Sequence, residues 1–122
     1  MGDARAESPG ESIARLYLYD LRRGPVELQV RVPGPQGTVF EVDMEFCGVL
    51  AEFDGAVKYS RTEFLRGRTP EQVVLDEKRR EDWIRGSTGK RMIRFGTPEL
   101  ADRDTFARYL SSLGIRPRRV TT

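Results

Sequence analysis

The stretch Glu41–Gly55, EVDMEFCGVLAEFDG, decides the fold, and it carries five carboxylates in fifteen residues of strand-like sequence. Apolar and acidic residues alternate up to Phe46, which is the period of a strand with one buried face. Cys47-Gly48 has the length of a two-residue hairpin turn, although cysteine is not a favoured first turn residue. The stretch therefore predicts two antiparallel strands, 39–46 and 49–54. The side chains expected on one face of the first strand are Phe40, Val42, Met44 and Phe46.

The register of this hairpin predicts a close approach of acids. With a two-residue turn, Phe46 pairs with Val49, and following the ladder back sets Asp43 opposite Glu52. Directly opposed residues share a face, so Asp43, Glu52 and Asp54 lie within reach of one ion. Like charges in such positions destabilise a sheet, and removing one of them could raise Tm. A divalent cation would neutralise them, and so would lysine and arginine side chains from a neighbouring helix.

Composition narrows the classes of function. The chain has 122 residues, 38% hydrophobic and 33% charged, which suits one compact domain. Its net charge of +2 is no signature of a nucleic-acid binder. The absence of histidine excludes imidazole zinc sites and histidine-based triads. Any metal would therefore be a hard cation held by oxygen, Mg²⁺ or Mn²⁺.

Compartment and boundaries follow from simple features. One cysteine, Cys47, excludes an internal disulfide, and the N-terminus lacks the apolar run of a signal peptide or membrane span. We therefore expect a soluble cytoplasmic protein with no membrane contact. We expect a flexible N-terminus at 1–7, a single domain at 8–114 and a basic flexible tail at 115–122.

The remaining elements are predicted from caps and periodicity. Ser8-Pro9-Gly10-Glu11 has the pattern of a capping box at the start of a first helix, and residues 26–32 alternate like a half-buried strand. Thr69-Pro70-Glu71-Gln72 begins a second helix. A strand at 91–95 and a helix ending near Leu113 follow. The order α-β-β-β-α-β-α predicts a mixed α/β domain.

An ordered set of motifs spans about residues 8–113: ESPGES, ELQV, VD, EFDG, KY, EKRRED and R-x-x-RF. Together they resemble the very-short-patch-repair (Vsr)-like endonuclease domains common in actinobacteria. Some of those domains lie at the C-terminus of AbiEi-type antitoxin-like regulators. The resemblance implies a restriction-endonuclease-like fold of the PD-(D/E)xK type, in which a helix supplies one acid and a mixed sheet supplies the rest of a metal site.

The resemblance also implies a catalytic set: Asp43, Glu52, Asp54, Lys58, Glu11 and Gln29. In that set Asp43, Glu52 and Asp54 hold Mg²⁺ or Mn²⁺, with Asp54 at the position where the usual superfamily motif has lysine. Lys58 contacts the scissile phosphate and stands where many relatives carry histidine. The chain also departs from the family in having a shorter interval from Asp43 to Glu52, without the usual Trp-Pro turn.

Two members of that set have a plain structural alternative. Glu11, which matches the helical glutamate of the family and would hold a metal-bound water, has a second reading as a helix cap. Gln29, which matches the strand glutamine, could equally be a surface residue of its strand.

The expected DNA contacts are basic: Lys58, Lys78, Arg79, Arg80, Arg91 and Arg94. They would hold the phosphate backbone with little sequence discrimination. Helical periodicity directs Arg80 toward the sheet, and Lys78 and Arg79 toward solvent or DNA. An ordinary solvated helix face with intrahelical acidic partners is the alternative. We expect Trp83 in the core rather than as a base-stacking wedge.

Two hypotheses of different class follow. The first is a divalent-metal-dependent DNA endonuclease or nickase, as the resemblance implies. The second is a catalytically silent nucleic-acid-binding or antitoxin-like regulatory module on the same fold. A homodimer or a complex with a partner protein suits either hypothesis, and so do roles in repair, defence or toxin–antitoxin regulation.

Overall fold

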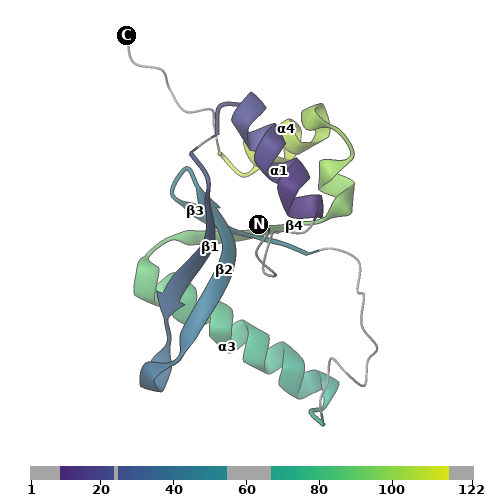
Figure 1. Ribbon diagram of the computed structural model, residues 1–122. Helices are drawn as coiled ribbons and strands as arrows, with labels where there is room; N and C mark the ends of the chain where they lie inside the picture. Colours follow the sequence, from purple (N-terminus) through teal and green to yellow (C-terminus); the bar gives the residue numbers. More distant parts are fainter. Residues whose placement is uncertain (1–8, 24, 55–66, 116–122) are drawn as a thin grey trace, which may run out of the picture.

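The computed structural model describes residues 9–23, 25–54 and 67–115, which confirm the predicted mixed α/β class. Within these ranges, three α-helices flank one four-stranded sheet (Figure 1). The elements are α1 (Pro9–Asp20), β1 (Glu27–Pro33), η1 (Pro35–Gly37), β2 (Val39–Phe46), β3 (Val49–Phe53), α3 (Pro70–Thr88), β4 (Arg91–Phe95), η2 (Thr97–Leu100) and α4 (Arg103–Ser112). The expected flexible N-terminus and Lys58 lie outside the described residues, as does the expected tail beyond Ile115.

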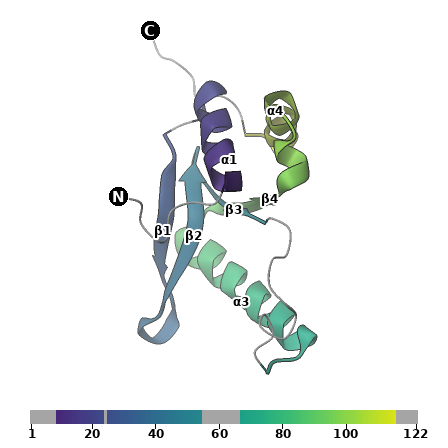
Figure 2. The same ribbon diagram turned by 45° about the vertical axis from the view of Figure 1, so that its right-hand side comes forward.

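The sheet is mixed, with the order β1-β2-β3-β4. The strands β1, β2 and β3 form an antiparallel meander, and β4 runs parallel to β3. In both ribbon views α1 and α4 lie together on one side of the sheet, and α3 runs along the other side (Figures 1 and 2). Each face of the sheet is therefore covered by a different part of the chain.

The tight hairpin turn is present as predicted. Cys47 and Gly48 both have positive φ, +53° and +74°, as both central residues of a type I′ turn do. The pairs run from Phe46↔Val49 back to Met44↔Ala51. Asp43 and Glu52 are the next positions beyond that last pair, so the register matches the prediction as far as the pairing extends.

The alternation predicted for β2 is present in its burial: Val42, Met44 and Phe46 are buried and Phe40 is half-buried, with exposed or half-buried residues between them. These apolar side chains pack in two clusters, however, rather than one. Phe40 and Val42 pack in a small cluster with Leu50 and Ile84, whereas Met44 belongs to the main cluster. On β2 the two clusters divide between Val42 and Met44, where the β1–β2 ladder is interrupted. At this point Gln29 has a φ of +53° and is not paired with the residue opposite, Asp43. The left-handed conformation of Gln29 is a local irregularity of β1, and the pairing register is the same on both sides of it.

The main core lies between the sheet and the helices α1 and α4. Leu18, Phe106 and Leu110 are fully buried there, and Phe106 lies 5.1 Å from Phe95 between ring centroids. The second cluster lies under α3 and contains four buried residues: Val32, Val42, Leu50 and Ile84. The two faces of the sheet are therefore packed to very different extents.

The start of α3 follows the predicted signal. Thr69 accepts a hydrogen bond from the backbone N–H of Gln72 at 3.1 Å, and the Gln72 side chain accepts one from the backbone N–H of Thr69 at 2.9 Å. This reciprocal pair is the predicted capping box. Gly89, with a φ of +71°, forms the C-cap. Among the described residues, neither α3 nor any other helix has the length and apolar character needed to cross a membrane.

Candidate functional site

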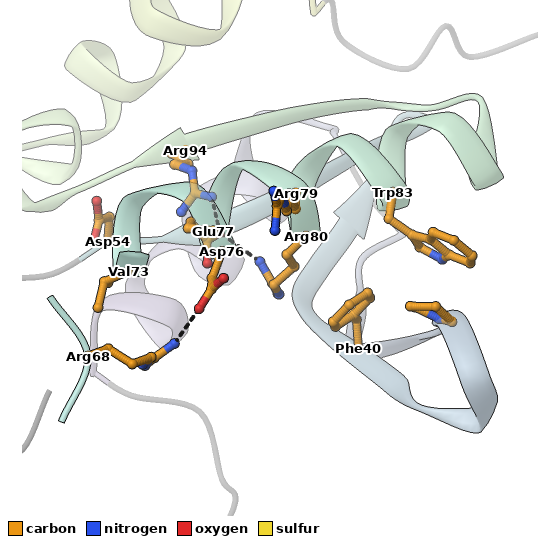
Figure 3. Close-up of a pocket in the computed structure, with 11 residues that line it drawn as sticks. Phe40, Asp54, Arg68, Val73, Asp76, Glu77, Arg79, Arg80, Trp83 and Arg94 are labelled. Atoms are coloured by element: carbon orange, nitrogen blue, oxygen red, sulfur yellow. Dashed lines mark hydrogen bonds and ion pairs between the residues drawn. The ribbon is translucent and has the colours of Figure 1, made fainter. Parts of the chain in front are cut away.

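A groove of about 700 Å³ runs along α3 where that helix faces the sheet (Figure 3). Residues of α3, β2 and β4 line it, together with residues of the β1–β2 connection, just after β3 and just before α3. They are Pro35, Phe40, Asp54, Arg68, Val73, Asp76, Glu77, Arg79, Arg80, Trp83 and Arg94. The groove therefore combines cationic, acidic and aromatic side chains.

Glu52 lies beneath this groove and is held by two arginines. Arg80 donates to both of its carboxylate oxygens, from Nη2 to Oε2 at 2.6 Å and from Nη1 to Oε1 at 3.2 Å. Arg94 approaches Oε1 at 3.3 Å and is also the partner of Glu52 in the parallel β3–β4 register. The Glu52 side chain is only 12% exposed. A bidentate guanidinium–carboxylate contact of this kind is strong and geometrically specific.

The two arginines extend the contact into a network. Glu77 accepts from Arg80 at 3.0 Å and from Arg94 at 2.5 Å, and Glu81 accepts from Arg94 at 3.3 Å. We call these five residues, Glu52, Glu77, Glu81, Arg80 and Arg94, the Glu52 ion cluster. Lysine or arginine from a neighbouring helix was the second predicted means of neutralising the acidic hairpin, and Arg80 supplies it for Glu52.

The positive charges of Arg80 and Arg94 are stabilised by the neighbouring glutamates. Burial alone would lower the pKa of Arg80 and of Arg94. Hydrogen bonds and Coulombic attraction from the nearby glutamates outweigh that cost and raise both pKa values above the ordinary arginine value. Arg80 also donates to the backbone oxygen of Glu41 at 2.8 Å, and its guanidinium carbon lies 5.8 Å from the centre of the Phe40 ring. The predicted direction of Arg80, toward the sheet, is confirmed.

The three expected metal ligands point to different partners. Asp43 is half-buried, and its Oδ2 accepts a hydrogen bond from the backbone N–H of Phe53 at 2.9 Å. Glu52 faces the arginines, and Asp54 is exposed at the edge of the groove. Within the described ranges, no set of three or more acidic or thiol side chains is placed to hold a metal ion. Carboxylates suit Mg²⁺ chemically. However, this arrangement does not fit an ion, because arginine engages both oxygens of Glu52.

Glu11 and Gln29, the other expected catalytic residues within the described ranges, lie close to β2 and β3. Glu11 is buried on α1. Its neighbour Gly10 packs so tightly on Phe53 that a Cβ there would lie 2.2 Å from the ring. The first turn of α1 therefore lies against the strand that carries Glu52. Gln29 is half-buried on β1 at the interruption of the ladder, opposite Asp43.

The expected DNA-contacting residues divide into two groups. Arg80 and Arg94 belong to the Glu52 ion cluster, so their guanidinium groups already have acidic partners. Lys78 is exposed, with Asp82 at 3.9 Å, and Arg91 is exposed at the start of β4. Arg79 is exposed and lines the groove, and the ion pairs found among the described residues do not include it.

Trp83 corrects the expectation that it belongs to the core. Its side chain is 41% exposed, whereas the adjacent Ile84 is fully buried under the sheet. The indole Nε1 donates to the backbone oxygen of Pro33 at 2.8 Å. Indole has a polar edge, so a groove wall with a nearby carbonyl acceptor suits it better than a fully apolar site. The spacing of Arg79 and Trp83, four residues apart on one helix, is the sequence signal that links them.

Comparisons with family models, with curated proteins and with solved structures found no significant match to the chain.

Proposed function

We propose that the chain is a restriction-endonuclease-like domain that binds nucleic acid along the groove on α3 without cleaving it. The antiparallel meander, followed by a helix and a parallel fourth strand, is compatible with such a fold. This is the binding or antitoxin-like regulatory module of the two sequence hypotheses, with DNA as the expected partner.

One observation carries the choice of binding over cleavage. Glu52, the glutamate that the resemblance assigns to the metal, has both oxygens engaged by Arg80 and a further contact from Arg94. A carboxylate neutralised by guanidinium is a weak ligand for a cation, because the cation would have to displace a bidentate contact. The cluster serves instead to fix α3 and the groove on the sheet.

The groove supports a modest affinity for nucleic acid. Four arginines line it, and two aromatic side chains, Phe40 and Trp83, stand among them. Arg68 pairs with Asp76 at 2.9 Å, and Arg80 and Arg94 belong to the Glu52 ion cluster, so the ion pairs of the described residues leave Arg79 for contact with phosphate. Cations interleaved with aromatic rings are the usual means of holding a nucleic-acid strand without reading its sequence. Asp54, Asp76 and Glu77 also line the groove and repel phosphate. Binding should therefore be weak and strongly dependent on salt.

Fluorescence anisotropy with labelled DNA in EDTA tests the proposal directly. We expect binding that weakens steeply as salt rises, and a weaker affinity for Arg79→Gln. Arg103→Gln is the matched control, because it removes the same charge from α4, where Arg103 pairs with Asp20 at 3.0 Å. Equal losses in the two variants would indicate a general charge effect, and no binding at low salt would overturn the proposal.

A metal-dependent DNA endonuclease is the second candidate. The observation in its favour is the placement of Asp43 and Glu52 on adjacent strands just beyond the last hairpin pair, with buried Glu11 on the helix that packs there. Nicking of supercoiled plasmid with Mg²⁺, Mn²⁺ or EDTA separates the two candidates. Metal-dependent nicking that Asp43→Asn abolishes would establish the nuclease. The binding module predicts no nicking in any of these conditions.

A further inference from the structure

We propose that Trp83 is a stacking platform for an unpaired nucleobase, so that the ligand of the groove is single-stranded nucleic acid. The inference rests on the proposed function and adds to it the class of ligand. It starts from a tryptophan that is exposed on a groove wall although the chain has an apolar core available to it.

The Trp83 side chain is held in place on that wall. Its indole N–H is bonded to the backbone oxygen of Pro33, which ties α3 to the end of β1. This bond uses the polar edge of the ring, while 41% of the side chain stays exposed. A ring fixed in this way loses little conformational entropy when a flat ligand stacks on it.

The charges near Trp83 favour a phosphate-bearing ligand. Arg79 lies four residues before Trp83 on α3, so the two side chains occupy neighbouring positions on one helix face. In Figure 3 Trp83 and Phe40 lie at one end of the groove, and Asp54, Val73 and Arg68 at the other. A base on Trp83 would therefore place its phosphate toward Arg79 and away from Asp54.

A single strand fits this site better than a duplex. Bases inside a duplex already stack on their neighbours and expose only their edges, whereas a single strand can present an open base face to an aromatic ring. Stacking of this kind is tolerant of sequence, because every base has a π-face. A proline-rich peptide, which also docks on exposed aromatic rings, is the competing ligand class.

The chain has a single tryptophan, so its fluorescence reports on Trp83 alone. The purified chain is titrated in EDTA with oligothymidylate, with an abasic oligonucleotide of the same length, and with a duplex. We expect oligothymidylate to quench the emission and to bind about tenfold more tightly than the abasic strand. Equal affinity for the two strands, or equal quenching by the duplex, would overturn the inference. Because such a result still requires binding, it would leave the proposed function standing.

Variants at Trp83 separate stacking from folding. Trp83→Leu should weaken oligothymidylate binding about tenfold by anisotropy and leave abasic binding unchanged. Trp83→Phe keeps a ring and should restore most of the affinity. Circular dichroism and Tm identify any variant that fails to fold. Binding of none of the three nucleic acids would overturn both the inference and the proposed function. Quenching by a proline-rich peptide alone would assign the platform to a protein ligand.

Discussion

The two faces of the sheet are attached to their helices by different kinds of interaction. Under α1 and α4 the contacts are mainly apolar: the main cluster contains twelve buried residues, and the centroid of the Phe106 ring lies within 6.5 Å of the centroids of Tyr17, Phe95 and Tyr109. Under α3 only Ile84 of the helix is buried, and the Glu52 ion cluster makes much of the remaining contact. Apolar packing therefore dominates on the face covered by α1 and α4, and ion pairs contribute much of the contact on the face covered by α3.

The difference matters because the two forces constrain geometry differently. Burial of apolar surface is non-directional and tolerates small shifts of a helix. A bidentate arginine contact fixes both distance and orientation. The long helix α3 therefore owes its position to a few directional contacts, and the groove beside it can respond to an ion or ligand that changes those contacts.

The largest loss of stability should come from a substitution in the main cluster, under α1 and α4. Phe106→Ala removes a fully buried ring at the centre of the main cluster and should lower the free energy of unfolding by about 3–5 kcal/mol. Denaturant unfolding measures this loss. Val74→Ala, on α3 and 69% exposed, is the control and should change stability by less than about 0.5 kcal/mol. Similar losses in the two variants would show that the main cluster does not dominate stability.

A smaller loss of stability should follow from a substitution in the Glu52 ion cluster, under α3. Glu52→Gln leaves Arg80 and Arg94 without their shared carboxylate and should cost about 1–3 kcal/mol, less than loss of a fully buried pair because both arginines are partly exposed. This reverses the sign expected from repulsion in the hairpin alone. A double-mutant cycle with Arg80→Gln measures the coupling. A rise in Tm for Glu52→Gln would show that the acids of the hairpin repel one another despite the arginines.

Several features of the fold could be predicted because their causes are local. The turn at Cys47-Gly48 fixed the hairpin register through its length, and Thr69 with Gln72 marked the start of α3. Helical spacing alone directed Arg80 toward the sheet, where it meets Glu52. In each case neighbours in the sequence determine the geometry.

Other features depend on contacts between distant segments and had no local signal. Periodicity cannot reveal that Gln29 adopts a left-handed conformation, nor that the apolar residues of β2 pack in two clusters. The parallel register that sets Arg94 beside Glu52 joins strands separated by a whole helix. The expectation of a core position for Trp83 takes no account of the carbonyl of Pro33, fifty residues away in the sequence, which accepts a hydrogen bond from its indole N–H.

The N-cap of α3 tests the contribution of a single hydrogen bond to the stability of that helix. Thr69→Ala removes the hydroxyl that accepts the Gln72 N–H and should cost about 1 kcal/mol. Thr97→Ala, at an exposed position on η2, is the matched control. A loss in Thr69→Ala well above 2 kcal/mol would mean that the first turn of α3 carries contacts beyond its cap.

The smallest effect concerns a single charge at the start of α4, on the side of the main cluster. Asp102 caps α4, and the backbone N–H of Thr105 lowers the pKa of its carboxyl. Because the folded pKa lies below the unfolded one, this contribution is present above the ordinary carboxyl pKa and is lost as pH falls through the folded value. Asp102→Asn keeps a capping side chain but does not titrate. The wild type should therefore be slightly more stable at pH 7, and the difference should shrink in acid, as denaturant unfolding at both pH values would measure. A difference that stays constant with pH would mean that Asp102 acts by shape alone.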